Sequence, residues 1–165
     1  MDLNYYKVEN NIYAGEYPFA KDSSIGLAKI CVLRNLCITD IIDLTEEGEL
    51  IPYNQYLNNI SHYRFPIKDR FVPESVESVK LLMEHMREKI DHNRTIYLHC
   101  WGGVGRTGTI VACWFVYHGY TFEEALGHLN NLWKECPKST RRTHCPEYKH
   151  QEDFVKHFDN YLHTL

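Results

Sequence analysis

Ten residues in the second half of the chain bring together a cysteine, an arginine and several glycines at a spacing suited to holding a phosphate. They read HCWGGVGRTG from His99 to Gly108, so five residues separate Cys100 from Arg106. Glycines let the backbone turn tightly, so that successive N–H groups point to one centre. The Arg106 guanidinium can bind two phosphate oxygens at once. The segment therefore predicts a cradle for a tetrahedral dianion.

The position of Cys100 at the floor of this cradle predicts nucleophilic chemistry. The N-terminus of the following helix carries partial positive charge, and together with Arg106 it favours an ionised sulfur. A thiolate beneath a bound phosphate is aligned for attack on phosphorus. Thr107 follows the arginine, and we expect its hydroxyl to hydrogen-bond the thiolate.

A strand and a helix must hold this segment in place. The sequence RTIYLH (94–99) is rich in β-branched and aromatic residues and predicts a strand, after which the glycine-rich residues 100–105 must turn. The sequence RTGTIVACWFVY (106–117) is apolar on nearly every side, which predicts a helix buried in the centre of the domain. We therefore expect the chemistry where a strand runs into a buried helix.

The remaining hydrophobic patterns alternate between strands and helices. We expect strands at 11–15, 39–44 and 62–65, helices at 24–36, 74–91 and 147–162, a helix begun by the capping box Thr121–Glu124, and loops at 67–73 and 136–146. The 24–36 helix, capped by Asp22 or Ser23, is expected to bury Ile25, Ala28, Cys31, Val32 and Leu36. Strands separated by helices predict one α/β domain over residues 1–165, with a central, mostly parallel, twisted sheet of about four to five strands flanked by helices.

Composition and charge exclude several other classes. The 165 residues carry 18 Lys and Arg against 22 Asp and Glu, a net charge of −4, which disfavours a nucleic-acid partner. From the sequence given we expect no secretory signal, no membrane span and no lipid anchor. No two of the six cysteines have C-x-x-C spacing, so we expect reduced thiols in a cytoplasmic protein, with no metal site and no cofactor. Cys31 and Cys113 lie on apolar helix faces and are expected in the core.

The segment from His99 to Thr107 resembles the signature of the cysteine-dependent protein tyrosine phosphatase superfamily, in particular its dual-specificity branch. Flanking matches follow in the same order as in that family. They are NIYAGEYP (11–18), LAKICVLRNLCITDIIDLTEE (27–47), the bacterial-like IDLTEEGELIPY (42–53), and Arg142, Pro146, Gln151 and Phe154. The resemblance covers residues 11–158 and implies a dual-specificity phosphatase-like fold.

The resemblance also implies a proton donor on a mobile loop upstream of the nucleophile. Asp69 lies 31 residues before Cys100, between an expected strand and an expected helix. Asp43 lies within a strand and Asp91 ends a helix, so both fit less well. A leaving oxygen departs poorly unless it is protonated as the P–O bond breaks. Asp69 is expected to supply that proton, and then as a carboxylate to activate the water that hydrolyses the phosphocysteine.

The roles of the other residues follow from the resemblance. The phosphate is expected to bind the loop formed by Trp101, Gly102, Gly103, Val104, Gly105 and Arg106. His99 is expected to orient this loop or to tune Cys100 from behind. Glu46 and Glu47 are candidate partners of Arg106, with a solvated turn as the equal alternative.

The expected function is metal-independent hydrolysis of phosphotyrosine, with phosphoserine and phosphothreonine as further targets, in proteins or peptides. We expect a monomer whose loop also binds phosphate, sulfate or vanadate. Phosphoinositides and inositol phosphates are the alternative substrates. None of residues 101–104 is basic, which disfavours them, although Lys68, Arg70, Arg141 and Arg142 are candidates for a basic mouth.

Other classes of protein share parts of this pattern. Residues 103–108 also fit the GxGxxG nucleotide fingerprint, but only 57 residues follow them, none in an expected strand, and the fingerprint does not account for Cys100. A phosphate-binding module without turnover would be expected to lack Cys100, Arg106 or Asp69. Low-molecular-weight phosphatases and arsenate reductases carry the Cys-x5-Arg motif near the N-terminus, and rhodanese-like sulfur transferases use a loop of another length.

Overall fold

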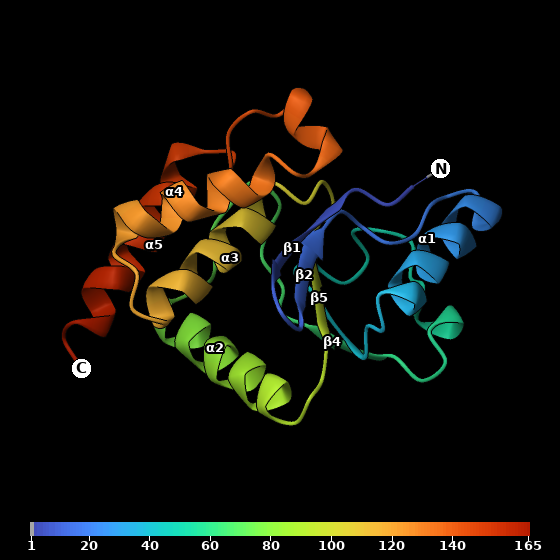
Figure 1. Ribbon diagram of the computed structural model, residues 1–165, viewed down its shortest axis with the longest axis horizontal. Coiled ribbons are helices and arrows are strands. Elements are labelled where there is room, and N and C mark those ends of the chain that lie inside the picture. Colours follow the sequence, from blue (N-terminus) through green and yellow to red (C-terminus); the bar gives the residue numbers. More distant parts are fainter. Residues whose placement is uncertain (1) are drawn as a thin grey trace.

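A β-sheet of five strands divides the molecule into two sides (Figure 1). The computed structural model describes residues 2–165. The strands are β1 (Tyr5–Glu9), β2 (Ile12–Gly15), β3 (Asp40–Asp43), β4 (Ser61–Arg64) and β5 (Ile96–His99). They lie in the order β1-β2-β5-β3-β4, with β1 antiparallel to β2 and the other neighbours parallel. The predicted α/β fold with a mostly parallel sheet is confirmed.

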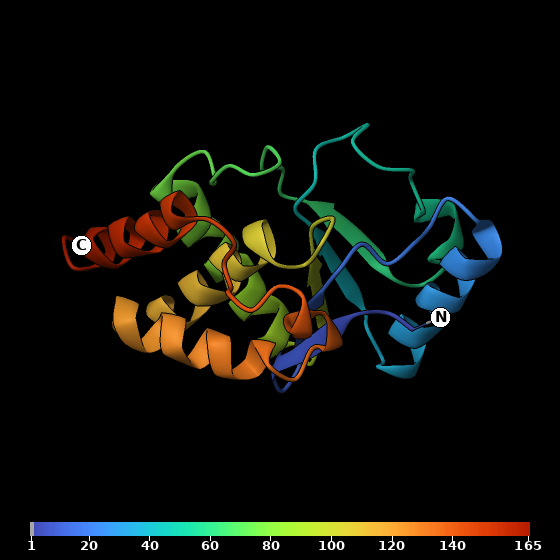
Figure 2. The ribbon, with the colours of Figure 1, turned by 90° about the horizontal axis from the view of Figure 1, so that it is seen from above.

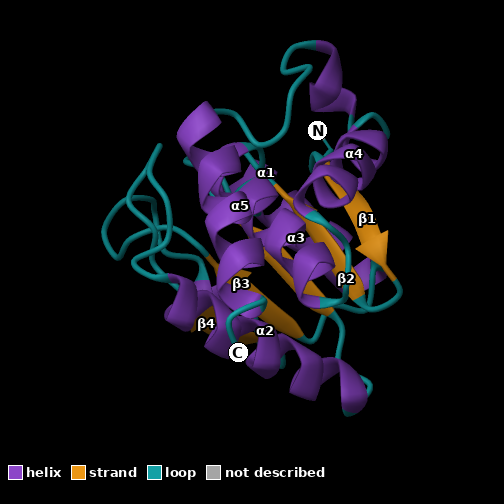
Figure 3. Ribbon diagram, turned by 90° about the vertical axis from the view of Figure 1, so that its left-hand side faces the viewer, coloured by secondary structure: helices purple, strands orange, loops and turns teal. Residues whose placement is uncertain are grey.

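The helices cover the two faces of the sheet unequally. One face carries α1 (Ser23–Asn35), and the other carries α2 (Val76–Asp91), α3 (Gly105–Tyr117), α4 (Phe122–Trp133) and α5 (Lys149–Leu162) (Figure 1). Figure 3 looks onto these four helices, with the strands behind them. Two 3₁₀ turns, η1 (Asn54–Tyr56) and η2 (Pro137–Thr140), lie in loops. Each side encloses a hydrophobic cluster, and the larger one lies under the four helices.

The central strand and the central helix are almost entirely buried. All four residues of β5 are buried, because β5 lies between β2 and β3 and both sheet faces are covered. In α3 every residue from Gly105 to Val116 is buried, as its apolar pattern predicts. Since close-packed interiors resist deformation, β5 and α3 hold both ends of the loop between them in fixed positions.

The strand register brings several loops to one edge of the sheet. Gly15, Asp43 and Arg64, the last residues of β2, β3 and β4, lie level with His99, the last residue of β5. In open α/β sheets, ligands bind beyond the carboxyl ends of the strands. This edge is therefore where a site is expected.

Local signals set most helix ends. Asp22 caps α1 through hydrogen bonds from the N–H groups of Ser24 and Ile25, and Ser75 caps α2. The capping box of Thr121 and Glu124 is formed at the start of α4, as predicted. These side chains satisfy backbone N–H groups that have no partner inside the helix.

Strand β1 is absent from the sequence-based prediction. Its signal is an alternation in which Tyr6 and Val8 are buried while Lys7 and Glu9 are exposed. The turn that follows uses Asn11 at a φ of 71°, a conformation that asparagine tolerates better than most residues. Only two residues separate β1 from β2, so the pair is a tight hairpin that completes the sheet.

The predicted buried face of α1 is wrong. The helix buries Gly26, Ile30 and Leu33, while Ala28 and Cys31 of the predicted face are exposed. Gly26 sets the orientation, because a Cβ there would lie 2.4 Å from the ring of Phe19. The placement of Cys31 in the core is therefore a wrong prediction, whereas Cys113 is buried as expected. The other three predicted residues, Ile25, Val32 and Leu36, are only partly buried.

Candidate active site

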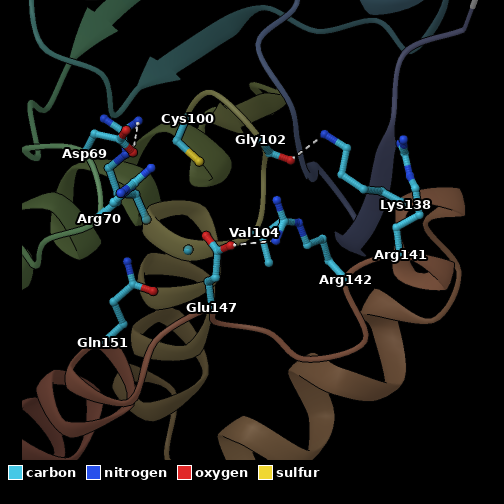
Figure 4. Close-up of a pocket in the computed structure, with 12 residues that line it drawn as sticks. Asp69, Arg70, Cys100, Gly102, Val104, Lys138, Arg141, Arg142, Glu147 and Gln151 are labelled. Atoms are coloured by element: carbon cyan, nitrogen blue, oxygen red, sulfur yellow. Dashed lines mark hydrogen bonds and ion pairs between the residues drawn. The ribbon is translucent and has the colours of Figure 1, made fainter.

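The loop that joins β5 to α3 curls over Cys100. This cysteine follows β5 directly and is 3% exposed, and the Gly103 N–H donates a hydrogen bond to its sulfur over 3.3 Å. Gly103 has a φ of 78°, and a Cβ there would lie 2.5 Å from the carbonyl carbon of Gly15. Glycine therefore lets the loop pack against the end of β2. Cys100 lines a cavity of about 430 Å³ (Figure 4).

Arg106, the second residue of α3, is buried and held by Glu49. Its Nη1 and Nη2 donate to the two carboxylate oxygens of Glu49 over 2.9 and 2.7 Å, and Nη1 also donates to the Ile67 carbonyl over 2.9 Å. Burial opposes the charge on Arg106, but the hydrogen bond to Glu49 and the neighbouring negative charges, that of Asp69 among them, together outweigh burial and raise the pKa of the guanidinium. The same pair lowers the pKa of the Glu49 carboxyl, again against the effect of burial.

Of the two alternatives for Glu46 and Glu47, partners of Arg106 or a solvated turn, the structure shows the solvated turn. Both side chains are exposed. The chain folds back between Glu46 and Glu49, where the Glu49 N–H donates to the Glu46 carbonyl over 3.1 Å. This turn directs Glu49, rather than its neighbours, to Arg106.

Asp69 reaches the same centre from the loop between β4 and α2. Its Oδ1 lies 3.1 Å from Arg106 Nη2, and it lines the cavity that Cys100 lines (Figure 4). The loops after β3, β4 and β5 leave the parallel part of the sheet at one edge (Figure 2). The structure therefore brings Cys100, Arg106 and Asp69 together.

Thr107 lies behind the loop with an unused hydroxyl. The residue is fully buried, and its hydroxyl has no hydrogen-bond partner within residues 2–165. The expected hydrogen bond to the Cys100 sulfur is therefore not formed in this structure. A buried hydroxyl without a partner is uncommon, since a buried donor that makes no hydrogen bond costs about 1–3 kcal/mol of stability.

His99 fixes the start of the loop from below. Its Nδ1 lies 2.8 Å from the Cys100 carbonyl oxygen, and its Nε2 lies 2.5 Å from the Tyr53 hydroxyl. Because a carbonyl only accepts, Nδ1 carries the proton and Nε2 accepts from Tyr53. Burial is the main cause that lowers the pKa of His99, although the nearby Asp43 opposes it. A neutral ring with one fixed tautomer therefore orients the Cys100 backbone.

Basic side chains surround the mouth of the cavity (Figure 4). Its other lining residues are Arg70, Gly102, Val104, Gly105, Lys138, Arg141, Arg142, Glu147 and Gln151. Of the expected basic mouth, Lys68 is absent from this lining, because its ammonium lies 4.9 Å from the ring centre of Phe71. Lys138 was not predicted. Its ammonium donates to Glu16 and to the Gly102 carbonyl, each over 2.9 Å.

Two further residues differ from the sequence-based expectation. Trp101 was expected at the phosphate, but its side chain is 57% exposed and lines an adjoining cavity of about 680 Å³. Gln151 was noted only for its match to a family pattern. It is fully buried beside Gly105, where an added Cβ would lie 2.8 Å from its amide nitrogen. Gln151 thus supports the loop where α3 begins.

A search for other kinds of site gives two findings. Within residues 2–165, no group of three or more His, Cys, Asp or Glu side chains is arranged to hold a metal ion. Among the helices of that same range, none has the length and apolar character needed to cross a bilayer.

Solved structures support the fold assignment. The active form of Tk-PTP superposes with a TM-score of 0.78 at 20% identity, covering 95% of this chain and 97% of that one. Kinase-associated phosphatase superposes with a TM-score of 0.77 at 20% identity, covering 99% and 96%. Both likenesses concern the fold.

Sequence comparisons identify the family. Phosphatidylglycerophosphate phosphatase PTPMT2 of Arabidopsis thaliana is 26% identical over 129 residues, 76% of this chain and 54% of that protein. The putative tyrosine phosphatase 067L of Invertebrate iridescent virus 3 is 37% identical over 86 residues, 49% of this chain and 35% of that protein. The chain thus spans about half or less of these relatives. The family model described as "Swiss Army Knife protein, DSP-PTPase phosphatase domain" matches residues 20–155, and the chain belongs to this dual-specificity branch of the protein tyrosine phosphatases.

Proposed function

We propose that this chain is a metal-independent phosphomonoester hydrolase that works through a cysteinyl-phosphate intermediate. The observation that carries the proposal is the convergence of Cys100, Arg106 and Asp69 on one cavity. A nucleophile, a bidentate phosphate ligand and a proton donor are the groups that this chemistry requires.

The first step transfers the phosphoryl group to sulfur. The Cys100 thiolate attacks phosphorus, the S–P bond forms as the P–O bond breaks, and Asp69 donates its proton to the leaving oxygen. Arg106 and the N–H groups of the loop bind the equatorial oxygens, so charge is neutralised by groups that are already in place. We propose that Thr107, whose hydroxyl has no partner in the described residues, donates it to the sulfur when the thiolate reappears.

The second step releases phosphate. Asp69, now a carboxylate, accepts a proton from a water that attacks phosphorus from the side the alcohol has left. The S–P bond breaks, inorganic phosphate departs and the Cys100 thiolate is restored. Both steps use the same acid–base group in opposite directions, as microscopic reversibility requires.

Replacement of the nucleophile tests this proposal. We expect Cys100→Ser to abolish turnover of 4-nitrophenyl phosphate while the wild-type rate is unchanged by a chelator, since no step uses a metal. Cys37→Ser is the matched control, because Cys37 is an exposed cysteine outside the cavity. Full activity in Cys100→Ser, or loss of wild-type activity on chelation, would contradict the mechanism.

We propose phosphotyrosine in proteins as the first substrate class, with phosphoserine and phosphothreonine beside it. The loop positions 101–104 carry no basic side chain, so the cradle itself provides for one phosphate. All six cysteines have free thiols, which is typical of a reducing compartment and supports our further proposal of a cytoplasmic enzyme. We also propose that it acts as a monomer, which gel filtration tests.

Phosphoinositides or other lipid phosphomonoesters are the second candidate class. The observation that favours them is the set of cations Arg70, Lys138, Arg141 and Arg142 at the mouth. Two relatives named as phosphatidylglycerophosphate phosphatases support it, as does a solved structure of PTPMT1 in complex with PI(5)P at 17% identity.

A side-by-side substrate panel separates the two classes. We would compare kcat/KM for phosphotyrosine and phosphothreonine peptides, PI(5)P, phosphatidylglycerophosphate and inositol phosphates. We expect the phosphotyrosine peptide to rank first. A higher kcat/KM for either lipid, with Arg141→Ala lowering only the lipid rate, would instead assign the enzyme to the second class.

A further inference from the structure

The first turn of α5 is hydrogen-bonded to the loop that carries Asp69. The His150 Nε2–H donates to the Arg70 carbonyl over 2.6 Å, and the Gln151 amide donates to the Phe71 carbonyl over 3.3 Å. Two neighbouring side chains of one helix therefore bind two consecutive carbonyls, directly after Asp69 in the chain. Asp69, Arg70 and Gln151 line the same cavity, with Gln151 below the other two in Figure 4.

The backbone at this point needs such support. Arg70 has a φ of 70°, the left-handed region that residues with a Cβ seldom adopt. A strained conformation of this kind persists only where surrounding contacts enforce it. The contact from His150 falls on the carbonyl of Arg70 itself, so it acts on the strained residue next to the proton donor.

A second set of contacts holds the same loop from the phosphate side. Arg106 donates to the Ile67 carbonyl over 2.9 Å and lies 3.1 Å from the Asp69 carboxylate. In the proposed reaction a phosphate competes for the Arg106 fork, and Asp69 must carry a proton, which removes the charge that pairs it with Arg106. The loop then depends more on its contacts with α5.

We propose that His150 is a positioning residue, which holds the Asp69 loop against α5 so that the acid is aligned with the leaving oxygen. The inference rests on the proposed hydrolase function. Its ring stacks on Tyr148 at 5.5 Å and packs against Phe71 at 6.4 Å between ring centres, which fixes the direction of Nε2. His150 is exposed, so its replacement leaves the core intact.

A leaving-group series is the test, because an acid matters only when the leaving oxygen needs a proton. We expect His150→Ala to lower kcat/KM for phenyl phosphate by about 3–10-fold, the weight of one hydrogen bond of modest net strength. For 2,4-dinitrophenyl phosphate, whose leaving group departs without protonation, we expect a change of less than about twofold. Asp69→Asn is the benchmark and should give the same pattern with a larger amplitude.

Two further variants separate positioning from a general structural effect. His150→Gln keeps an amide donor near the position of Nε2 and should recover most of the phenyl phosphate rate. His157→Ala is the matched control, since His157 is an exposed histidine two turns further along α5. It should leave kcat/KM unchanged for both substrates. An equal loss on both substrates, no loss, or a loss in His157→Ala of the same size would overturn the inference.

A measurement independent of activity keeps this inference distinct from the proposed function. Hydrogen exchange of residues 67–73 should be faster in His150→Ala than in wild type. If Cys100→Ser kept full activity while exchange in His150→Ala rose, the proposed mechanism would be contradicted, but the contact of His150 with the loop would be supported. If activity depended on Cys100 but exchange in His150→Ala equalled that of wild type, only the inference about His150 would be contradicted.

Discussion

At the scale of single residues, the contact between Glu49 and Arg106 controls the orientation of the phosphate ligand. Both bonds come from the Nη1–Nη2 end of the guanidinium, so they fix its plane. Nη2 also lies 3.1 Å from the Asp69 carboxylate, with which a bound phosphate competes. Arg106 is 2% exposed, and a buried cation that loses its partner is costly. Glu49 therefore affects both the stability of the loop and its readiness to bind phosphate.

Replacement of Glu49 by glutamine should weaken catalysis without removing the side chain. Gln keeps an acceptor but loses the charge, and hydrogen bonds to charged groups exceed neutral ones by about 1–1.5 kcal/mol. We expect kcat/KM for an aryl phosphate to fall about tenfold. Glu46→Gln, in the same turn but exposed, is the control and should stay near wild type. Equal losses in the two variants would argue against a specific contact.

The cavity-lining residues that the sequence singles out are those whose signal can be found along the chain itself. Cys100 and Arg106 lie in one short segment, and Asp69 is placed by the order of strand, loop and helix. Glu49 and Lys138 are not predictable in this way, because each meets the loop only through the fold, across 57 and 36 residues. A glutamate in a polar turn and a lysine in a 3₁₀ turn both look like solvated charges.

At the scale of elements, the start of α3 is shaped to fit the loop before α5. A Cβ on Gly108 would lie 2.5 Å from the Cys145 sulfur and 3.1 Å from Pro146 Cα. The Cys145 thiol in turn donates to the carbonyl of Val104 over 3.3 Å. The glycine that follows Thr107 therefore lets two distant segments meet directly beneath the phosphate loop.

Gly108→Ala should push these two elements apart. Overpacking of a close-packed core costs about 1–3 kcal/mol, so we expect a lower free energy of unfolding and a lower kcat/KM. Cys145→Ala in the same chain removes the closest atom and should restore part of both. Gly127→Ala is the control, because nothing lies within 4 Å of a Cβ there. In an α4 interior it should stabilise by about 0.5–1 kcal/mol. A neutral Gly108→Ala would contradict the packing argument.

Element boundaries follow from periodicity better than element faces do. Helix α2 was expected from 74 to 91 and spans Val76–Asp91, because its apolar stripe is continuous. In α1 apolar residues occur on several sides, so the buried face depends on what the sheet offers, and the contact of Gly26 with Phe19 decides it. Such a choice between faces is made by tertiary packing.

At the scale of the whole molecule, ion pairs of buried or partly buried carboxylates link the elements. Glu16 pairs with Lys29 and Lys138, Asp40 with Arg94, Asp43 with His62, and Glu49 with Arg106. In each case burial would raise the pKa of the carboxyl, but its hydrogen bonds and neighbouring charges outweigh burial and lower it. Every one of these ties is therefore made by the ionised form.

This arrangement predicts a fold that weakens in acid. A carboxyl whose pKa is lowered by folding contributes stability above its unfolded pKa, about 3.9 for Asp, and loses it as the pH falls toward the folded value. We expect Asp43→Asn to lower the free energy of unfolding by about 2 kcal/mol at pH 7. The difference in unfolding free energy between the variant and wild type should become smaller below about pH 4. Urea unfolding followed by the buried Trp114 and Trp133 measures both. Asp91→Asn, at an exposed position, is the control. The argument would be contradicted if its difference in unfolding free energy from wild type had the same pH dependence, or if the difference for Asp43→Asn did not change with pH.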